Sequence, residues 1–197
     1  MELIFFDLEC TCWDKNEFLS REDSEIIEIG AVKFKNGDII EKFHSYVKPY
    51  YHPMLSEFCS NLTNIKQSVI LTSDEIGIAL NRFDLWIGDA DLLISWGEYD
   101  KNMIVKEIRN KNIKNDSIIE KLQKKHFNLK NVFMERYNKK HSAGLSKALN
   151  FFNLKFQGKQ HSALDDSINM VQIFNAMKLN DIIGEENDYK NKITDRI

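Results

Sequence analysis

The chain has 197 residues, of which 43% are hydrophobic and 11% aromatic, and its formal net charge is −3. This length fits one domain, and the apolar content is enough for a buried core, which excludes a disordered chain. No apolar run approaches the roughly 18 residues that a membrane-spanning helix needs, and the N-terminus lacks a secretory signal pattern. We therefore expect an intracellular, cytoplasmic protein with no membrane partner.

The charge is unevenly distributed along the chain. Residues 101–140 contain ten Lys and two Arg against four acids, a net charge of +8, so the remainder carries −11. Such a run is usually a solvated helix face. A basic flank beside an acidic site would also hold a polyanion near bound metal. The three cysteines, Cys10, Cys12 and Cys59, lack a paired zinc-binding spacing and are expected to be reduced thiols.

The first part of the chain is predicted to form three strands. Residues 2–8 contain an apolar run, and residues 25–35 are rich in Ile, Val and Phe with partial alternation. Asn36-Gly37 tolerates positive φ at both positions and predicts a hairpin turn. Residues 38–47 then return as a third strand. The domain is therefore expected to open with one strand followed by an antiparallel hairpin.

The later elements alternate between helices and short strands. Thr72 and Glu75 have the spacing of a capping box, with Thr72 as the N-cap of a helix. A buried strand is expected over 90–95 and a short strand over 127–132, with helices over 98–109, 145–152 and 163–179. This order predicts an α/β fold with a mixed sheet flanked by helices. We expect one domain over residues 1–182 and a polar tail over 183–197.

Two acids stand together at the end of the first predicted strand. Asp7 and Glu9 share one face of it, separated by roughly 7 Å according to the rise of a strand. Two carboxylates this close repel each other unless a positive group joins them. They either lie at a solvated strand end or bind a hard divalent cation such as Mg²⁺, which takes oxygen ligands.

Further ionisable groups occur where such a site would need them. Asp100 follows the strand at 90–95, at the carboxyl edge where α/β sheets usually bind ligands. Ser162 is expected to cap the last helix, which would place Asp165 in its first turn, and Asp166 follows one position later. A lone His is more often incidental than functional, but His161 precedes Asp166 by five residues and is a candidate general base.

These residues resemble the motifs of the DEDDh 3′–5′ exonucleases, namely DxE on the first strand, a later Asp, and HxAxxD at the last helix. The five positions are Asp7, Glu9, Asp100, His161 and Asp166. The blocks EIIEIGAV, YVKP, FCSNLTNI, SWGEYD and KQHSALDDS resemble the subfamily of the 3′ histone-mRNA exonuclease and the RNA-interference-associated exonucleases. The resemblance covers about residues 3–180. It implies a ribonuclease H-like fold, with a mixed five-stranded sheet, one strand antiparallel, flanked by helices.

The resemblance also implies a two-metal mechanism with Mg²⁺ or Mn²⁺. Asp7, Glu9 and Asp166 would surround the first ion, while Asp7 would bridge to a second ion held by Asp100. His161 would take a proton from the attacking water, and the product would be a nucleoside 5′-monophosphate. The HxAxxD spacing selects Asp166 rather than Asp165 as the final ligand, which leaves Asp165 as a helix-cap acid.

The resemblance suggests five substrate-binding residues. Tyr99 either stacks on the terminal base or packs beneath its helix. The backbone of Cys10 and Thr11 is expected to approach the 3′-terminal sugar. Phe58 and Leu62 either pack inside the protein or form a wall of the nucleotide pocket. Where family members often carry Leu-Thr-Gly-Ile, this chain has Asn64 in place of Gly, and Asn tolerates a left-handed turn.

The leading hypothesis is a metal-dependent 3′–5′ exonuclease acting on the 3′ end of single-stranded RNA or DNA, with RNA slightly favoured. A module that binds nucleic-acid ends without turnover, or only with a partner, is the alternative from a different class. A polymerase proofreading subunit would share the chemistry but depend on its polymerase. An endonuclease of ribonuclease H type would lack the HxAxxD block.

Overall fold

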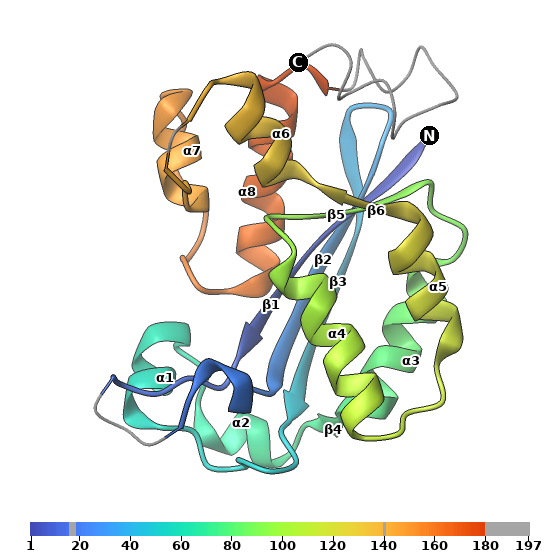
Figure 1. Ribbon diagram of the computed structural model, residues 1–197, viewed down its shortest axis with the longest axis vertical. Coiled ribbons are helices and arrows are strands. Elements are labelled where there is room, and N and C mark those ends of the chain that lie inside the picture. Colours follow the sequence, from blue (N-terminus) through green and yellow to red (C-terminus); the bar gives the residue numbers. More distant parts are fainter. Residues whose placement is uncertain (16–18, 140, 180–197) are drawn as a thin grey trace.

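The computed structural model describes residues 1–15, 19–139 and 141–179 (Figure 1). Over these ranges the strands form one mixed sheet with the order β4-β3-β2-β1-β5-β6. The strands are β1 Glu2–Cys10, β2 Ile26–Lys35, β3 Asp38–Lys48, β4 Asp74–Glu75, β5 Leu92–Ser95 and β6 His126–Asn128. The predicted tail at 183–197 lies outside the described residues.

Helices cover both faces of this sheet (Figure 1). The helices are α1 Glu57–Thr63, α2 Gln67–Leu71, α3 Ile76–Ile87, α4 Tyr99–Asn110, α5 Asp116–Lys125, α6 Leu129–Arg136, α7 Leu145–Phe151 and α8 Ala163–Ala176, with a 3₁₀ turn at Arg21–Asp23. One hydrophobic cluster lies between the sheet and α6–α8, and a second lies between the sheet and α3–α5. Within the described ranges, no helix has both the length and the apolar character needed to cross a membrane.

The strand directions confirm the predicted mixed sheet. β2 is antiparallel to both β1 and β3, whereas β5 runs parallel to β1 and β6 parallel to β5. The β2–β3 hairpin turns at Asn36 and Gly37, whose φ angles are 55° and 94°, as the dipeptide predicts. The expected number of strands was wrong by one. The sixth strand is β4, a two-residue segment parallel to the end of β3.

The predicted capping box is wrong. Thr72 ends α2, and its hydroxyl donates to the backbone carbonyls of Ser68 and Val69 at 3.2 and 3.1 Å. Thr72 has φ −104° and ψ 1°, outside the extended region usual for an N-cap, and β4 at Asp74–Glu75 separates it from the next helix. The following helix, α3, begins at Ile76, with Glu75 at the N-cap position and no side-chain cap hydrogen bond.

The region after β5 contains more helix than predicted. β6 covers only Phe127 and Asn128 of the strand expected at 127–132, and Asn128 then caps α6 by accepting the backbone N–H of Asn131 at 3.0 Å. The lysine-rich α5 was not predicted, although Asn115 caps it and Ile118 and Leu122 are buried at helical spacing. The high density of lysines masked this short apolar stripe.

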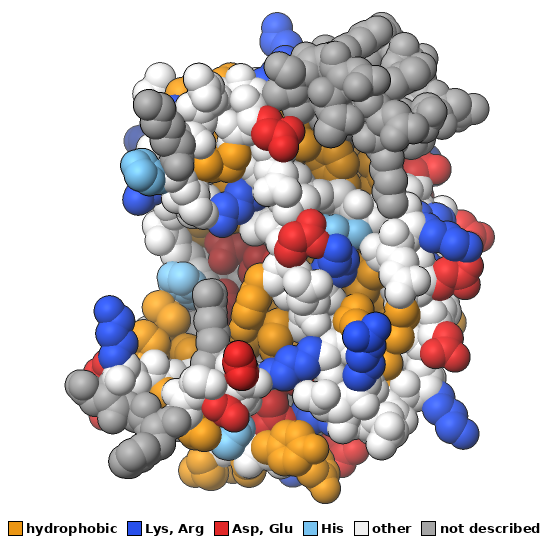
Figure 2. Space-filling view, viewed as in Figure 1, with side chains coloured by type: hydrophobic (Ala, Val, Ile, Leu, Met, Phe, Trp, Pro, Cys, Tyr) orange, Lys and Arg blue, Asp and Glu red, His pale blue; other side chains and the backbone are white. Residues whose placement is uncertain are grey.

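Alternation along β1 determines where the acids point. Leu3 and Phe5 belong to the cluster beneath α6–α8, whereas the intervening Ile4 belongs to the cluster beneath α3–α5. Because successive strand residues point to opposite faces, Asp7 and Glu9 continue the series of Leu3 and Phe5. The two acids therefore face α8. Figure 2 shows acidic side chains recessed in a hollow on this side of the molecule, with a histidine at its edge.

Candidate active site

The first turn of α8 rests directly on β2 at Gly30. Gly30 is the cross-strand partner of Asp7, and a Cβ added to it would lie 2.0 Å from the backbone nitrogen of Leu164. The hydroxyl of Ser167 donates to the Gly30 carbonyl at 2.9 Å. Only glycine permits so close an approach. This contact therefore brings Asp166, in the same turn of α8, to the acids of β1.

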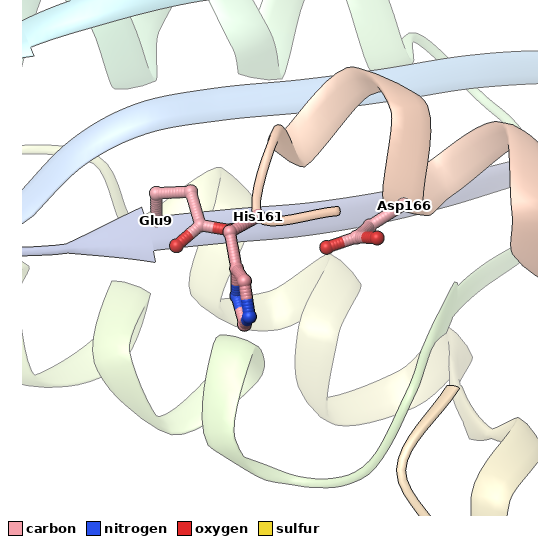
Figure 3. A group of neighbouring side chains, drawn as sticks. All are labelled: Glu9, His161 and Asp166. Carbon is pink, nitrogen blue, oxygen red and sulfur yellow. The ribbon is translucent and has the colours of Figure 1, made fainter. Parts of the chain in front are cut away.

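Glu9, His161 and Asp166 converge from three segments (Figure 3). Each offers one ligand atom, and these three atoms all lie within 4.8 Å of one another. The Nδ1 atom of His161 is 4.0 Å from Oε1 of Glu9. The His161 side chain is 49% exposed, whereas Glu9 is buried. The structure thus brings the DxE and HxAxxD motifs together, with the histidine on the solvent side.

The backbone of His161 adopts the left-handed conformation, with φ at 62°. This region is uncommon for a residue with a side chain and is often found at functional sites. The backbone N–H of His161 donates to the Asp166 carboxylate, while its ring lies near Glu9. Ser162 occupies the N-cap position of α8 as predicted but makes no side-chain cap hydrogen bond.

Asp100 reaches the same site from the opposite side of β1. It lies in the first turn of α4 and is 5% exposed. Its carboxylate accepts hydrogen bonds from its own backbone N–H and from that of Leu8. The β1–β5 ladder ends at the pair Phe5 and Ile94, so the N–H of Leu8 lies beyond it. This bond ties Asp100 to the segment of β1 that carries Asp7 and Glu9.

The pKa values of all four acids are raised above their ordinary values. Burial is the largest cause in each case, raising the pKa of Glu9 to about 9 and those of Asp100 and Asp166 to about 7. The pKa of Asp7 is also raised well above its ordinary value, by burial and then by the charges of the other three. A buried group of carboxylates with raised pKa values is typical of a functional site.

This donor set fits a hard divalent cation. The four side chains offer carboxylate oxygens, the ligands that Mg²⁺ and Mn²⁺ prefer. A bound cation would also favour the ionised carboxylates, which burial and mutual repulsion disfavour. Asp165 is separate from this group, because its Oδ2 accepts the backbone N–H of Lys159 at 2.8 Å. It stabilises the turn before His161 rather than capping its own helix.

The backbone at the end of β1 is already hydrogen bonded within the protein. The N–H of Thr11 donates to the Glu25 carbonyl at 2.8 Å, and its hydroxyl accepts the N–H of Glu25 at 2.9 Å. The carbonyl of Cys10 accepts the Sγ–H of Cys59 at 3.7 Å. The expected approach of Cys10 and Thr11 to a sugar stays a prediction, and the N–H of Thr11 is engaged elsewhere.

The other predicted substrate residues differ in their exposure. Tyr99 is half-buried, packs against the cluster beneath α3–α5 and hydrogen bonds to the side chain of Cys10. Phe58 on α1 is 43% exposed, whereas Leu62 is half-buried. Ser56, which caps α1, donates from its hydroxyl to the Cys12 carbonyl at 2.6 Å. This bond places α1 beside the end of β1. Asn64 ends α1 with φ at 59°, the left-handed turn expected of it.

Sequence reasoning missed Glu28 and His44. Glu28 is buried and lies opposite Glu9 in the β1–β2 ladder. Its Oε1 lies 2.7 Å from Nε2 of His44 on β3. An acid at the centre of the apolar block EIIEIGAV is a signal that could have identified Glu28. The His44 contact depends on strand register, which that block does not contain.

Comparisons with known proteins identify the family of the chain. The sequence profile of the exonuclease family (RNase_T) matches residues 4–174. ERI1 exoribonuclease 2 of Xenopus laevis is 30% identical over 200 residues, which cover 89% of this chain and 28% of that protein. The Mus musculus protein of the same name is 32% identical over 192 residues, which cover 85% and 27%. The chain thus spans less than a third of the length of these relatives.

A solved structure is similar over most of its length. The nuclease domain of 3′hExo, described as a DEDDh family member bound to rAMP, superposes with a TM-score of 0.80 at 25% identity. The match covers 91% of this chain and 92% of that one. The chain belongs to the exonuclease (RNase_T) family, and it is related to the ERI1 exoribonucleases and to 3′hExo, a DEDDh nuclease.

Proposed function

We propose that this chain removes nucleotides from the 3′ end of single-stranded nucleic acid and releases nucleoside 5′-monophosphates. One observation carries the proposal, namely the convergence of ligand atoms from Glu9, His161 and Asp166 within 4.8 Å of one another. Asp7 and Asp100 approach the same point from β1 and α4. A buried acidic group beside an accessible histidine supports hydrolysis of a phosphodiester rather than binding alone.

The family implies divalent metal ions, and we assign their ligands to the four acids. Asp7, Glu9 and Asp166 would hold one Mg²⁺ or Mn²⁺, and Asp100 would hold a second ion together with Asp7. Such ions stabilise the charge that develops on the attacking and leaving oxygens of a phosphoryl displacement. The chain's own contribution is to fix these carboxylates, through the Gly30 contact beneath α8 and the Leu8 N–H bond to Asp100.

His161 is assigned as the general base. Its side chain is 49% exposed, so it is open to an incoming water molecule. Its backbone N–H bond to Asp166 links the position of the ring to that of a metal ligand. Imidazole is the side chain most often used as a general base in proteins. His161 would therefore take a proton from the attacking water without itself binding the metal.

RNA is the proposed substrate, with DNA as the alternative that the experiment tests. Two relatives are named exoribonucleases, and the 3′hExo nuclease domain is described as bound to rAMP. Phe58 is exposed on α1 beside the end of β1, where its ring could contact a terminal base. An exposed aromatic ring stacks on any base, so Phe58 does not itself discriminate between RNA and DNA.

The test uses matched single-stranded RNA and DNA oligonucleotides labelled at the 5′ end, incubated with Mg²⁺, Mn²⁺ or EDTA. We expect a metal-dependent ladder that shortens from the 3′ end, appearing first on RNA. Internal cleavage, or a ladder that persists in EDTA, would contradict the proposal. Tight binding without shortening would instead support the alternative of a silent end-binding module.

A further inference from the structure

A fifth carboxylate, that of Glu28, is buried beside the four acids of the site. Glu28 is 2% exposed and lies directly opposite Glu9 in the antiparallel β1–β2 ladder. It is two residues from Gly30, so both lie on the face of β2 that contacts α8. Opposite side chains in such a pair have Cβ atoms about 5 Å apart, and like charges there are destabilising.

His44 is the hydrogen-bond partner of the buried Glu28 carboxyl group. The Nε2 atom of His44 lies 2.7 Å from Oε1 of Glu28. This distance is that of a hydrogen bond, in which the tautomer with hydrogen on Nε2 would donate to the carboxylate. In the part of the chain that the structure describes, this is the hydrogen bond that the Glu28 side chain accepts. The second carboxylate oxygen of Glu28 is therefore available to another donor.

A purely structural role explains this pair poorly. β2 and β3 are already joined by a ladder from Glu28 and Tyr46 to Lys35 and Asp38, so a further link between the strands adds little. The His44 side chain is 35% exposed while that of Glu28 is 3% exposed, so the carboxylate is desolvated far more than its partner. A buried carboxylate whose only partner is half-exposed lowers the stability of the folded state unless a cation also interacts with it.

The charge of Glu28 reaches the other acids of the site. Glu28 is among the causes that raise the pKa values of Asp7, Glu9 and Asp166, after burial in each case. It does not replace any of the four acids in the DEDDh motif. Its place in the ladder, opposite Glu9 and on the α8 face, puts it behind the ligands rather than among them.

We propose that Glu28, oriented by His44, is a positioning residue of the metal centre that raises its affinity for divalent cations by accepting hydrogen bonds from their water ligands. This inference rests on the proposed function, because the cations are those of the nuclease site. Residues that support metal ligands in this way typically contribute 10- to 100-fold in metal affinity. Glu28 adds negative charge and an oxygen acceptor without being a direct ligand.

The test measures metal binding separately from activity. Glu28→Gln keeps the shape of the side chain and removes its charge, while Glu41→Gln is a matched control at an exposed acid of β3 that pairs with Lys33 at 3.4 Å. Mn²⁺ affinity is measured by calorimetry, and Tm is measured with and without Mn²⁺. We expect Glu28→Gln to bind Mn²⁺ at least about 10-fold more weakly. Its metal-free Tm should stay the same or rise, because a repelling charge has gone.

His44 supplies the second variant pair. His44→Gln keeps a donor and should retain most of the Mn²⁺ affinity, whereas His44→Leu should lose affinity as Glu28→Gln does. Unchanged affinity in Glu28→Gln would overturn the inference. So would a fall in its metal-free Tm with no change in the Mn²⁺-induced shift, which would indicate a structural ion pair. If the wild-type chain itself shows no Mn²⁺-dependent shift, the proposed function fails instead.

Discussion

Two groups of buried acids lie near the ends of β1 and β2, and they differ in what neutralises them. In the first group Lys111 lies between Glu25 and Glu107, with Nζ 2.6 Å from a carboxylate oxygen of each. Glu25 also accepts the backbone N–H groups of the loop at 50–52. Burial raises the pKa of Glu25, but Lys111 and these N–H groups outweigh it and lower the pKa below its ordinary value.

The second group contains Asp7, Glu9, Asp100 and Asp166. Among the residues that the structure describes, no Lys or Arg forms an ion pair with these four. Their pKa values are raised by burial and, for all but Asp100, also by one another. In the first group, where the acids stabilise the fold, Lys111 neutralises them. In the second group we expect a cation from solution to do so.

Replacing Asp7 should have the largest effect. Asp7→Asn removes a ligand that we assign to both ions, so we expect a loss of activity on the order of 10⁴-fold, about 5 kcal/mol of transition-state stabilisation. The rate of shortening of a 5′-labelled RNA measures it. The metal-free Tm should not fall, because a repelling charge is removed. Activity close to that of the wild type would remove the assignment of Asp7.

Replacing Lys111 should affect the other group in the opposite way. Lys111→Met leaves Glu25 and Glu107 without their cation, which should cost about 3–5 kcal/mol of unfolding free energy in urea. Added Mg²⁺ should stabilise Lys111→Met and the wild type by the same amount, because the ion binds the second group in both, so the difference between them should persist. A difference that disappears in saturating Mg²⁺ would show that the two groups are not distinct.

Replacing His161 should separate chemistry from metal binding. His161→Gln is expected to lower kcat on the order of 10² to 10³-fold, because the general base is lost. Its Mn²⁺ affinity should stay near that of the wild type, as calorimetry can measure. A parallel loss of Mn²⁺ affinity would make His161 a ligand instead, in line with its distance of 4.0 Å from Glu9.

The stability of the metal-free chain should fall as pH rises. Raised pKa values mean that the folded state holds more protons than the unfolded state between about pH 4, where free carboxyls titrate, and the folded values. Those are about 7 for Asp100 and Asp166 and about 9 for Glu9. Tm measured in EDTA from pH 5 to 9 should therefore decrease, and saturating Mg²⁺ should flatten the decrease. A Tm that rises over this range would contradict the account.

Tyr99 should show the smallest effect. Tyr99→Phe removes the hydroxyl that bonds to Cys10 and should cost about 1 kcal/mol of stability. If Tyr99 only packs, this variant keeps the KM of the wild type, and Tyr99→Ala lowers stability without raising KM selectively. A raised KM in Tyr99→Ala with unchanged stability would restore the stacking role.

The local pattern of the sequence was enough to predict the strands that position the site. The apolar run before Asp7, the Asn36-Gly37 turn and the apolar spacing of the last helix each depend on neighbours in the chain. The capping box at Thr72 failed because the same hydroxyl can bond forward or backward, and its helix, α2, was not predicted. Local patterns do not decide between such alternatives.

What the sequence left out depends on contacts between distant segments. The requirement for glycine at position 30 comes from the close contact of α8, at Leu164, with this residue. The role that we propose for Glu28 depends on the strand register, which places it opposite Glu9 and beside His44. The need of the second group for a cation likewise follows only from the tertiary structure, in which Lys111 pairs with Glu25 and Glu107 of the first group.

We infer that the acids around Asp7 bind a divalent cation from solution. The experiment is a calorimetric titration of the wild-type chain with Mn²⁺ near pH 7.5, beside Asp7→Asn and Lys111→Met. We expect Mn²⁺ binding in the wild type and in the folded fraction of Lys111→Met, and its loss in Asp7→Asn. Equal binding by the wild type and Asp7→Asn, or no binding by the wild type, would contradict it.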